Sequence, residues 1–227
     1  MQDRYYLEMA AAYVRGKLRK GNESKVHFSK QLRDLSVAEQ EQLFELGYDQ
    51  GLRLHKFKRT MELPRVQRVL GVLKGLYPSS LLDIGTGRGV FLWPLLAEFS
   101  ELDVACIDVR VDRFEDLMHV RNGGIERLSP YNLDACSLAF PDESFDIVTV
   151  LEVLEHMPNA QQALNEAVRV CRRNVIITVP STEDDNPEHI HLLDKTKLKD
   201  MLAQAGARAR FQGVRNHIVV VGTKVRA

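Results

Sequence analysis

The segment from Leu81 to Leu95, LLDIGTGRGVFLWPL, contains three glycines within five positions and one preceding carboxylate. It joins a short apolar run to a predicted helix, so glycine backbone with positive φ would lead into the helix start. The free amides and partial positive charge of a helix start favour a ligand that approaches the backbone closely. The residues predicted to contact this ligand are Asp83, Gly85, Thr86, Gly87 and Gly89.

Two further acids follow at the ends of predicted strands. Asp108 lies 19 positions after the last glycine of the turn, where a carboxylate can accept both hydroxyls of a ribose. Asp134 and Ala135 lie where a third strand should end, and an acid beside a small residue there can bind an adenine edge. Asp83 precedes the turn, where a negative charge favours an ammonium or sulfonium group over a pyrophosphate.

The elements that must position these residues alternate between strand and helix from residue 80 onward. Apolar runs predict strands buried on both faces at 80–84, 103–107, 146–151 and 174–179, with a weaker strand at 125–133. Helical patterns occupy 89–99, 111–120, 159–172 and 195–205. The last two strands, 207–214 and 217–225, have no helix between them and are expected to form a hairpin. This order predicts an α/β fold whose mostly parallel sheet carries helices on both faces.

The first 77 residues have helical patterns instead. Ser36 and Glu39 form a capping-box pattern, and Pro64 suits the first turn of another helix. Residues 1–80 hold 15 Lys and Arg against 9 Asp and Glu, whereas residues 81–227 hold 16 against 22. The basic segment is therefore either an arm for a polyanion or a helical surface that docks on an acidic domain; the neutral total favours docking.

Composition narrows the class of protein. Hydrophobic residues make up 44% and charged residues 27% of the 227 residues, which is typical of a globular protein. No apolar run is long enough for a membrane helix, and the N-terminus lacks the pattern of a secretory signal. Cys106, Cys136 and Cys171 form no CxxC pair, so we expect buried free thiols and a reducing cytoplasm.

Four motifs in the same order resemble one family. They are LLDIGTGRG, the acid Asp108, LDACSLAFPDESFDIVTVLEVLEHM and the final hairpin. Together they resemble the class I S-adenosylmethionine-dependent methyltransferases, in the branch with Leu-Glu-His after the fourth strand. The resemblance covers about residues 66–224. It implies a Rossmann-like sheet of seven strands in the order 3-2-1-4-5-7-6, with strand 7 antiparallel, preceded by an N-terminal helical segment.

The resemblance also implies roles for particular residues. The glycine turn would lie beside the methionine and ribose parts of the cofactor, with Asp83 near the methionine amino group, directly or through water. Asp134 would accept from the adenine amino group, and the Ala135 amide would donate to the ring. The remaining cofactor contacts implied are Asp108 at the ribose, Val109 directly after it, and the backbone around Leu151 and Glu152 at the methionine part.

Substrate choice is expected to lie in residues 1–63, as a helical lid over the cofactor domain of residues 64–227. The aromatic and basic candidates for facing the acceptor or the cofactor carboxylate are Tyr48, His55, Lys56, Phe57, Lys58 and Arg59. The run HKFKR within this set would also suit phosphate, as in RNA. A basic helix end is the commoner explanation of such a run.

Three histidines are candidate general bases for an acceptor that must lose a proton: His156, His189 and His191. Glu155 and His156 would alternatively only cap the end of the fourth strand. Glu188, His189 and His191 also suggest a metal site, but the ligand pattern is incomplete, so we predict no metal.

The predicted function is methyl transfer to an oxygen, nitrogen or carbon nucleophile of a small molecule. An RNA acceptor and a non-catalytic partner subunit that keeps the cofactor fold are the alternatives. TVLEVLEH stands where methyltransferases of nucleic-acid amino groups carry an Asn-Pro-Pro-Tyr-like element. A nicotinamide-dependent oxidoreductase is disfavoured by Asp83 and by the closing hairpin. The sequence does not indicate an oligomeric state.

Overall fold

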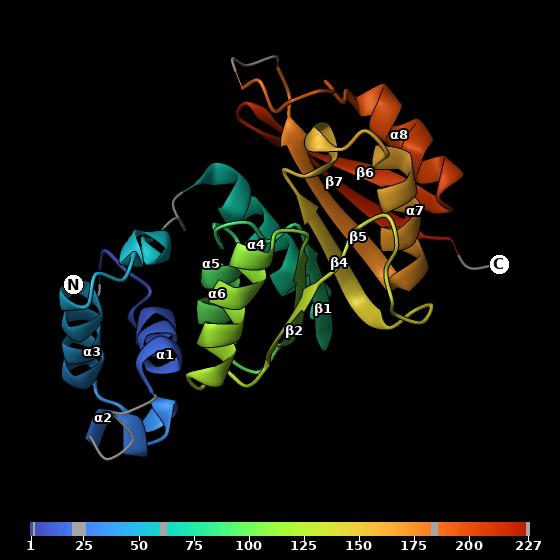
Figure 1. Ribbon diagram of the computed structural model, residues 1–227. Coiled ribbons are helices and arrows are strands. Elements are labelled where there is room, and N and C mark those ends of the chain that lie inside the picture. The colour runs from blue at the N-terminus through green and yellow to red at the C-terminus, as the bar shows by residue number, and fades with distance from the viewer. Residues whose placement is uncertain (2, 20–25, 60–62, 183–185, 226–227) are drawn as a thin grey trace.

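The computed structural model describes residues 1, 3–19, 26–59, 63–182 and 186–225. Within them lies one seven-stranded sheet in the order β3-β2-β1-β4-β5-β7-β6 (Figure 1). The strands are β1 Ser80–Ile84, β2 Asp103–Asp108, β3 Leu128–Asn132, β4 Phe145–Leu151, β5 Cys171–Pro180, β6 Ala207–Val214 and β7 His217–Lys224. β7 runs antiparallel to both β5 and β6, and the other pairs are parallel, so the predicted order and direction are confirmed.

The described helices are α1 Leu7–Leu18, α2 Val26–Ser29, α3 Val37–Asp49, α4 Pro64–Leu76, α5 Leu92–Glu98, α6 Val111–Asn122, α7 Ala160–Val170 and α8 Lys195–Gln204, with short 3-10 turns η1 Leu32–Asp34, η2 Leu54–Phe57 and η3 Leu154–His156. Ser36 accepts from the Glu39 amide at the start of α3, and the Glu39 carboxylate accepts from the Ser36 amide. Pro64 occupies the first turn of α4. Both predicted helix starts are confirmed.

The sheet separates two apolar layers. Leu81 of β1 belongs to the layer that contains α4, α5, α6 and the N-terminal helices. Leu82 belongs to the layer that contains α7 and α8. Alternate residues of a strand point to opposite faces, so an unbroken apolar run in β1 supplies both layers at once.

Two element boundaries differ from the prediction. The helix expected from residue 89 begins at Leu92, because Gly85, Gly87 and Gly89 have φ values of +71°, +58° and +80° and keep the chain in a turn. The strand expected from residue 174 begins at Cys171, directly after α7. Its first residues are less apolar than the rest, so the hydrophobic pattern marked only the inner part of the strand.

The N-terminal segment docks against α6. Helix α1 lies along α6 (Figure 1), and the backbones come close at Gly16 within α1 and at Gly123 directly after α6. A Cβ added at Gly16 would lie 2.0 Å from the His119 carbonyl oxygen, and one at Gly123 would lie 1.7 Å from that of Ala12. No helix in the described part of the chain is long and apolar enough to span a membrane.

All three cysteines are free. Cys106 and Cys171 are buried as expected, and burial raises the pKa of the Cys171 thiol to about 11. Cys136 is only half-buried, so the expectation of burial is wrong there. It follows the Asp134–Ala135 loop at the edge of a cavity, where the chain has left β3.

Candidate active site

Two adjoining cavities form one cleft at the carboxyl ends of β1, β2 and β4. The larger has a volume of about 690 Å³ and the smaller about 190 Å³. Gly85, Gly87, Arg88 and Glu152 line both. The cleft therefore lies where parallel α/β sheets bind ligands, and its two parts meet at the glycine turn.

The three glycines of the turn differ in the space that a side chain would have. A Cβ at Gly85 would lie 2.4 Å from the Val153 side chain, and one at Gly89 would lie 2.2 Å from the Trp93 ring. A Cβ at Gly87 would have the Gly85 carbonyl oxygen as its nearest neighbour, 3.9 Å away. Gly85 and Gly89 are thus needed for close packing, whereas Gly87 leaves open space beside the cleft.

Asp108 ends β2 with its carboxylate beside the turn. One carboxylate oxygen, Oδ2, accepts from the Gly87 amide at 2.8 Å, and the other accepts from the Arg110 amide at 2.9 Å. The side chain is 8% exposed and lines the larger cavity. Two backbone donors therefore hold the carboxylate at the cleft wall, in a position that suits the hydroxyls of a ribose.

Asp83 lies deeper, on the wall of the smaller cavity, and is 3% exposed. Its Oδ1 accepts from the Thr149 hydroxyl at 2.7 Å. Burial raises the pKa of this carboxyl to about 6, against the lowering effect of its hydrogen bonds. The Thr86 hydroxyl donates to the Asp83 carbonyl oxygen at 3.4 Å, which ties the turn to the strand.

The predicted adenine contacts, Asp134 and Ala135, line the larger cavity, as does Val109 directly after β2. The Asp134 carboxylate accepts from the Cys136 amide at 2.8 Å, and Ala135 is buried. The structure therefore brings the predicted ribose and adenine residues to one cavity, although they come from two different loops.

Leu151 and Glu152 end β4 between the two cavities. Glu152 has a φ of +56°, a left-handed conformation that is unfavourable for a residue with a side chain. Its carboxylate accepts from the Thr178 hydroxyl at 2.7 Å and lies 3.1 Å from Nε2 of His217 and 3.8 Å from Nε of Arg65. A strained backbone and a fixed carboxylate thus coincide at the centre of the cleft.

The three candidate histidines do not converge. His156 lines the larger cavity, and its ring centroid lies 4.7 Å from that of His189. His191 is exposed, and it is joined to this region by its backbone amide, which donates to the Glu155 carbonyl oxygen. The structure therefore pairs His156 with His189 and leaves the His191 ring outside the pair.

Two of the aromatic and basic residues proposed to face the acceptor have other roles. Phe57 is fully buried between Tyr13 and Trp93, and the Lys56 ammonium pairs with Asp116 of α6. For these two the expectation is wrong, because both are used to dock the N-terminal segment. Tyr48 is 73% exposed to solvent. No residue in the described part of 1–63 lines either cavity of the cleft.

The N-terminal segment nevertheless reaches the glycine turn. The Trp93 indole, which packs beneath Gly89, donates to both the Lys56 carbonyl oxygen and the Arg88 carbonyl oxygen, at 2.9 and 3.0 Å. The start of α4 then contributes Arg65, Val66 and Val69 to the smaller cavity. The cofactor domain of residues 64–227 thus begins at the wall of the cleft, and the role of residues 1–63 as a lid stays a prediction.

Sequence reasoning missed three residues that surround the Glu152 carboxylate in or beside the cleft. Arg65, Thr178 and His217 surround Glu152 but come from α4, β5 and β7. None of them belongs to a local motif, because they meet only after the sheet has formed. The left-handed position of Glu152 likewise has no sequence signal, since glutamate rarely adopts it.

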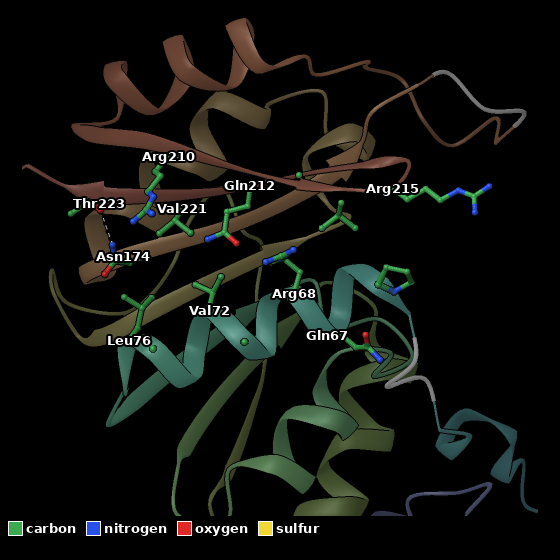
Figure 2. Close-up of a pocket in the computed structure, with 15 residues that line it drawn as sticks. Gln67, Arg68, Val72, Leu76, Asn174, Arg210, Gln212, Arg215, Val221 and Thr223 are labelled. Atoms are coloured by element: carbon green, nitrogen blue, oxygen red, sulfur yellow. Dashed lines mark hydrogen bonds between the residues drawn. The ribbon is translucent and has the colours of Figure 1, made fainter.

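A separate groove of about 860 Å³ lies between α4 and the face formed by β5, β6 and β7 (Figure 2). Arg68 of α4 points toward Gln212 of β6 across it, whereas Arg215 extends away. Asn174 donates to the Thr223 hydroxyl at 2.9 Å along its floor. None of the predicted site residues lines this groove.

Comparisons with known proteins agree with the geometry. Residues 82–179 match a family profile described as a methyltransferase domain. The 27-O-demethylrifamycin SV methyltransferase of Amycolatopsis mediterranei is 33% identical over 110 residues, which cover 46% of this chain and 39% of that protein. The probable chloroplastic tocopherol O-methyltransferase of Oryza sativa subsp. japonica is 30% identical over 129 residues, covering 52% of this chain and 35% of that protein.

The matched region thus spans less than half the length of either relative. A solved S-adenosylmethionine-dependent methyltransferase from Aquifex aeolicus superposes with a TM-score of 0.62 at 23% identity, over 73% of this chain and 92% of that one. This likeness concerns the fold. The sheet order and the glycine turn thus give this chain the fold of class I S-adenosylmethionine-dependent methyltransferases, and residues 82–179 match a methyltransferase domain.

Proposed function

We propose that this protein transfers the methyl group of S-adenosylmethionine to a nucleophile of a small-molecule acceptor. The observation that carries the proposal is the cleft at the glycine turn, with open space at Gly87 and the Asp108 carboxylate held beside it. In this cleft Asp108 would bind the ribose, Asp134 and Ala135 the adenine, and Asp83 the methionine amino group. These residues line one continuous wall, which fits an adenosyl group joined to an amino acid.

S-Adenosylmethionine supplies the electrophilic methyl group, so the protein has chiefly to align the acceptor with it and to exclude water. Glu152 stands between the two cavities, where the sulfonium of such a cofactor would lie. Thr178 and His217 hold its carboxylate in place, so negative charge faces the region of the positive sulfur. His156 lies on the same wall and, with His189, is the group proposed to face the acceptor.

The acceptor class rests on the relatives and on the contacts that basic residues of the N-terminal segment make inside the molecule. The named relatives are, by their names, methyltransferases of a rifamycin precursor and of tocopherol, which are small molecules. The basic N-terminal segment uses Lys56 to dock on α6, and Arg15 donates to the Lys30 carbonyl oxygen. Docking of this kind favours a small acceptor over RNA. The three free cysteines favour work in a reducing cytoplasm.

Calorimetry with S-adenosylmethionine tests the cofactor site. We expect Asp108→Ala to weaken binding by at least about 100-fold, because two charge-assisted hydrogen bonds to the ribose are lost. Asp112→Ala is the matched control: this acid, 57% exposed on its side chain, pairs with Arg110 and lines neither cavity, so affinity should stay within twofold. Tight binding by a folded Asp108→Ala protein would contradict the assignment.

The acceptor is sought with labelled cofactor and fractionated cell extract. We expect label in a small-molecule fraction and none in RNA or protein. Label in RNA would replace the proposed acceptor class while leaving the cofactor site intact. Failure to form S-adenosylhomocysteine with every fraction, despite tight cofactor binding, would instead support the non-catalytic partner.

A further inference from the structure

A cluster of three metal-ligating side chains lies beside the cleft. Glu155 and His156 come from η3, directly after β4, and His189 comes from the loop after β5. One ligand atom of each lies within 4.8 Å of the other two. The sequence analysis predicted no metal, because it grouped Glu188, His189 and His191; the structure replaces Glu188 and His191 in that group by Glu155 and His156.

Backbone hydrogen bonds fix the two parts of the cluster to each other. The amides of Ile190 and His191 both donate to the Glu155 carbonyl oxygen, at 2.9 and 3.2 Å. The loop that carries His189 is thereby joined to η3 across 34 positions of sequence. A site assembled from two tethered segments keeps its geometry without an ion, which lowers the entropy lost on binding one.

The orientation of His156 is the one that a metal ligand needs. Its Nδ1 lies 2.9 Å from the Glu188 carbonyl oxygen. A carbonyl only accepts, so Nδ1 carries the proton and Nε2 keeps its lone pair for another partner. Metal-binding histidines are oriented in this way by a carbonyl or carboxylate on the far ring nitrogen.

The chemistry of the three ligands limits which ion would fit. Glu155 is 1% exposed and contributes a carboxylate. Its neighbours in the cluster are two imidazoles, whose neutral form binds metals. Two nitrogens and one carboxylate oxygen suit a divalent transition ion such as Zn²⁺ or Co²⁺, whereas Mg²⁺ and Ca²⁺ prefer oxygen ligands alone.

We propose that Glu155, His156 and His189 form a binding site for one divalent transition-metal ion at the edge of the cleft. Small side-chain rotations would bring the three ligand atoms to about 2.1 Å from a shared ion. Three protein ligands leave further coordination positions open. Because His156 lines the cleft, an extension that rests on the proposed function is that these positions hold an oxygen atom of the acceptor.

Titration of the metal-free, untagged, full-length protein with Co²⁺ tests the site, read by visible absorption and by metal analysis after equilibrium dialysis. We expect one Co²⁺ per chain, weakened at least about 100-fold in His189→Ala. His191→Ala, two positions away with an exposed ring, and Glu188→Gln should bind within twofold of the original protein. Glu155→Gln, which keeps the shape of the buried side chain, should also lose the ion.

Three outcomes would overturn the site. They are no Co²⁺ binding at millimolar metal, unchanged binding in a folded His189→Ala protein, and equal losses in His189→Ala and His191→Ala. Calorimetry with S-adenosylmethionine on the metal-free protein separates this result from the proposed function. Cofactor binding without Co²⁺ binding would refute the metal site alone, and Co²⁺ binding without cofactor binding would refute the cofactor assignment alone.

Discussion

Asp83 and Asp108 show how two identical side chains near the ends of neighbouring strands acquire different properties. Asp108 is held by two backbone amides at the cleft wall. Asp83 is buried among apolar strands, accepts from Thr149, and has a pKa raised to about 6. The raised pKa of Asp83 follows from its burial, because desolvation opposes the charged form of a carboxyl group.

The raised pKa predicts a pH-dependent cofactor affinity. An ammonium beside Asp83 requires the ionised carboxylate, so affinity should fall by up to about tenfold for each pH unit below 6. Calorimetry between pH 5 and 8 measures this decline. In Asp83→Asn the cofactor affinity should be low across this whole pH range, and it should no longer fall as the pH drops below 6. A decline of the same size in the variant would assign it to another group.

The same shift predicts an effect on stability without cofactor. The folded-state pKa lies above the ordinary value of 3.8, so the native state binds the proton more tightly than the unfolded state does. The stabilisation from this proton is complete below about pH 4 and is lost as the pH rises through 6, a change of about 3 kcal/mol. Asp83→Asn should therefore be more stable than the original protein at pH 7.5 but not at pH 4, as denaturant unfolding would show.

At the scale of elements, the close contact of α1 with α6 determines where the N-terminal segment lies. Gly16 and Gly123 let the two backbones meet, and the Tyr13 hydroxyl donates to Asp116 at 3.0 Å. The sequence predicted the helical character of this segment from its periodicity. It did not predict the docking surface, because a glycine within a helix does not indicate which helix approaches it.

Two glycine substitutions test this contact against helix propensity. Gly16→Ala would place a Cβ 2.0 Å from the His119 carbonyl oxygen, so we expect a loss of about 1–3 kcal/mol in the free energy of unfolding. Gly71→Ala in α4 meets nothing within 4 Å and should stabilise the protein by about 0.5–1 kcal/mol. Equal effects of the two substitutions in denaturant titrations would argue against the α1–α6 contact.

At the scale of the whole molecule, the N-terminal helices and the cofactor domain share one apolar layer. Met9 of α1, Phe57 of η2, Leu117 of α6 and Leu81 of β1 belong to the same buried cluster. Basic residues of the segment reinforce this packing, as Lys56 does by pairing with Asp116. At least this basic residue therefore serves a contact inside the molecule, as the docking interpretation of the uneven charge predicts.

This shared layer predicts that residues 64–227 do not fold well alone. Removing residues 1–63 would expose α6 and the Trp93 side of the glycine turn, which Phe57 now covers. We expect the truncated protein to aggregate or to unfold at a temperature well below that of the full chain, measured by circular dichroism. A soluble fragment with an unchanged melting temperature and cofactor affinity would show that the segment is an independent domain.

The sheet order could be predicted before the structure from the family resemblance. The strands, the glycine turn and Asp83, Asp108 and Asp134 could be predicted from local patterns. Those features are readable because hydrophobic period and turn chemistry act between residues close in sequence. Only the tertiary structure joined Glu152 to His217 across 65 positions and His189 to the Glu155 region across 34. Such contacts depend on strand register and loop paths, which the whole fold decides together.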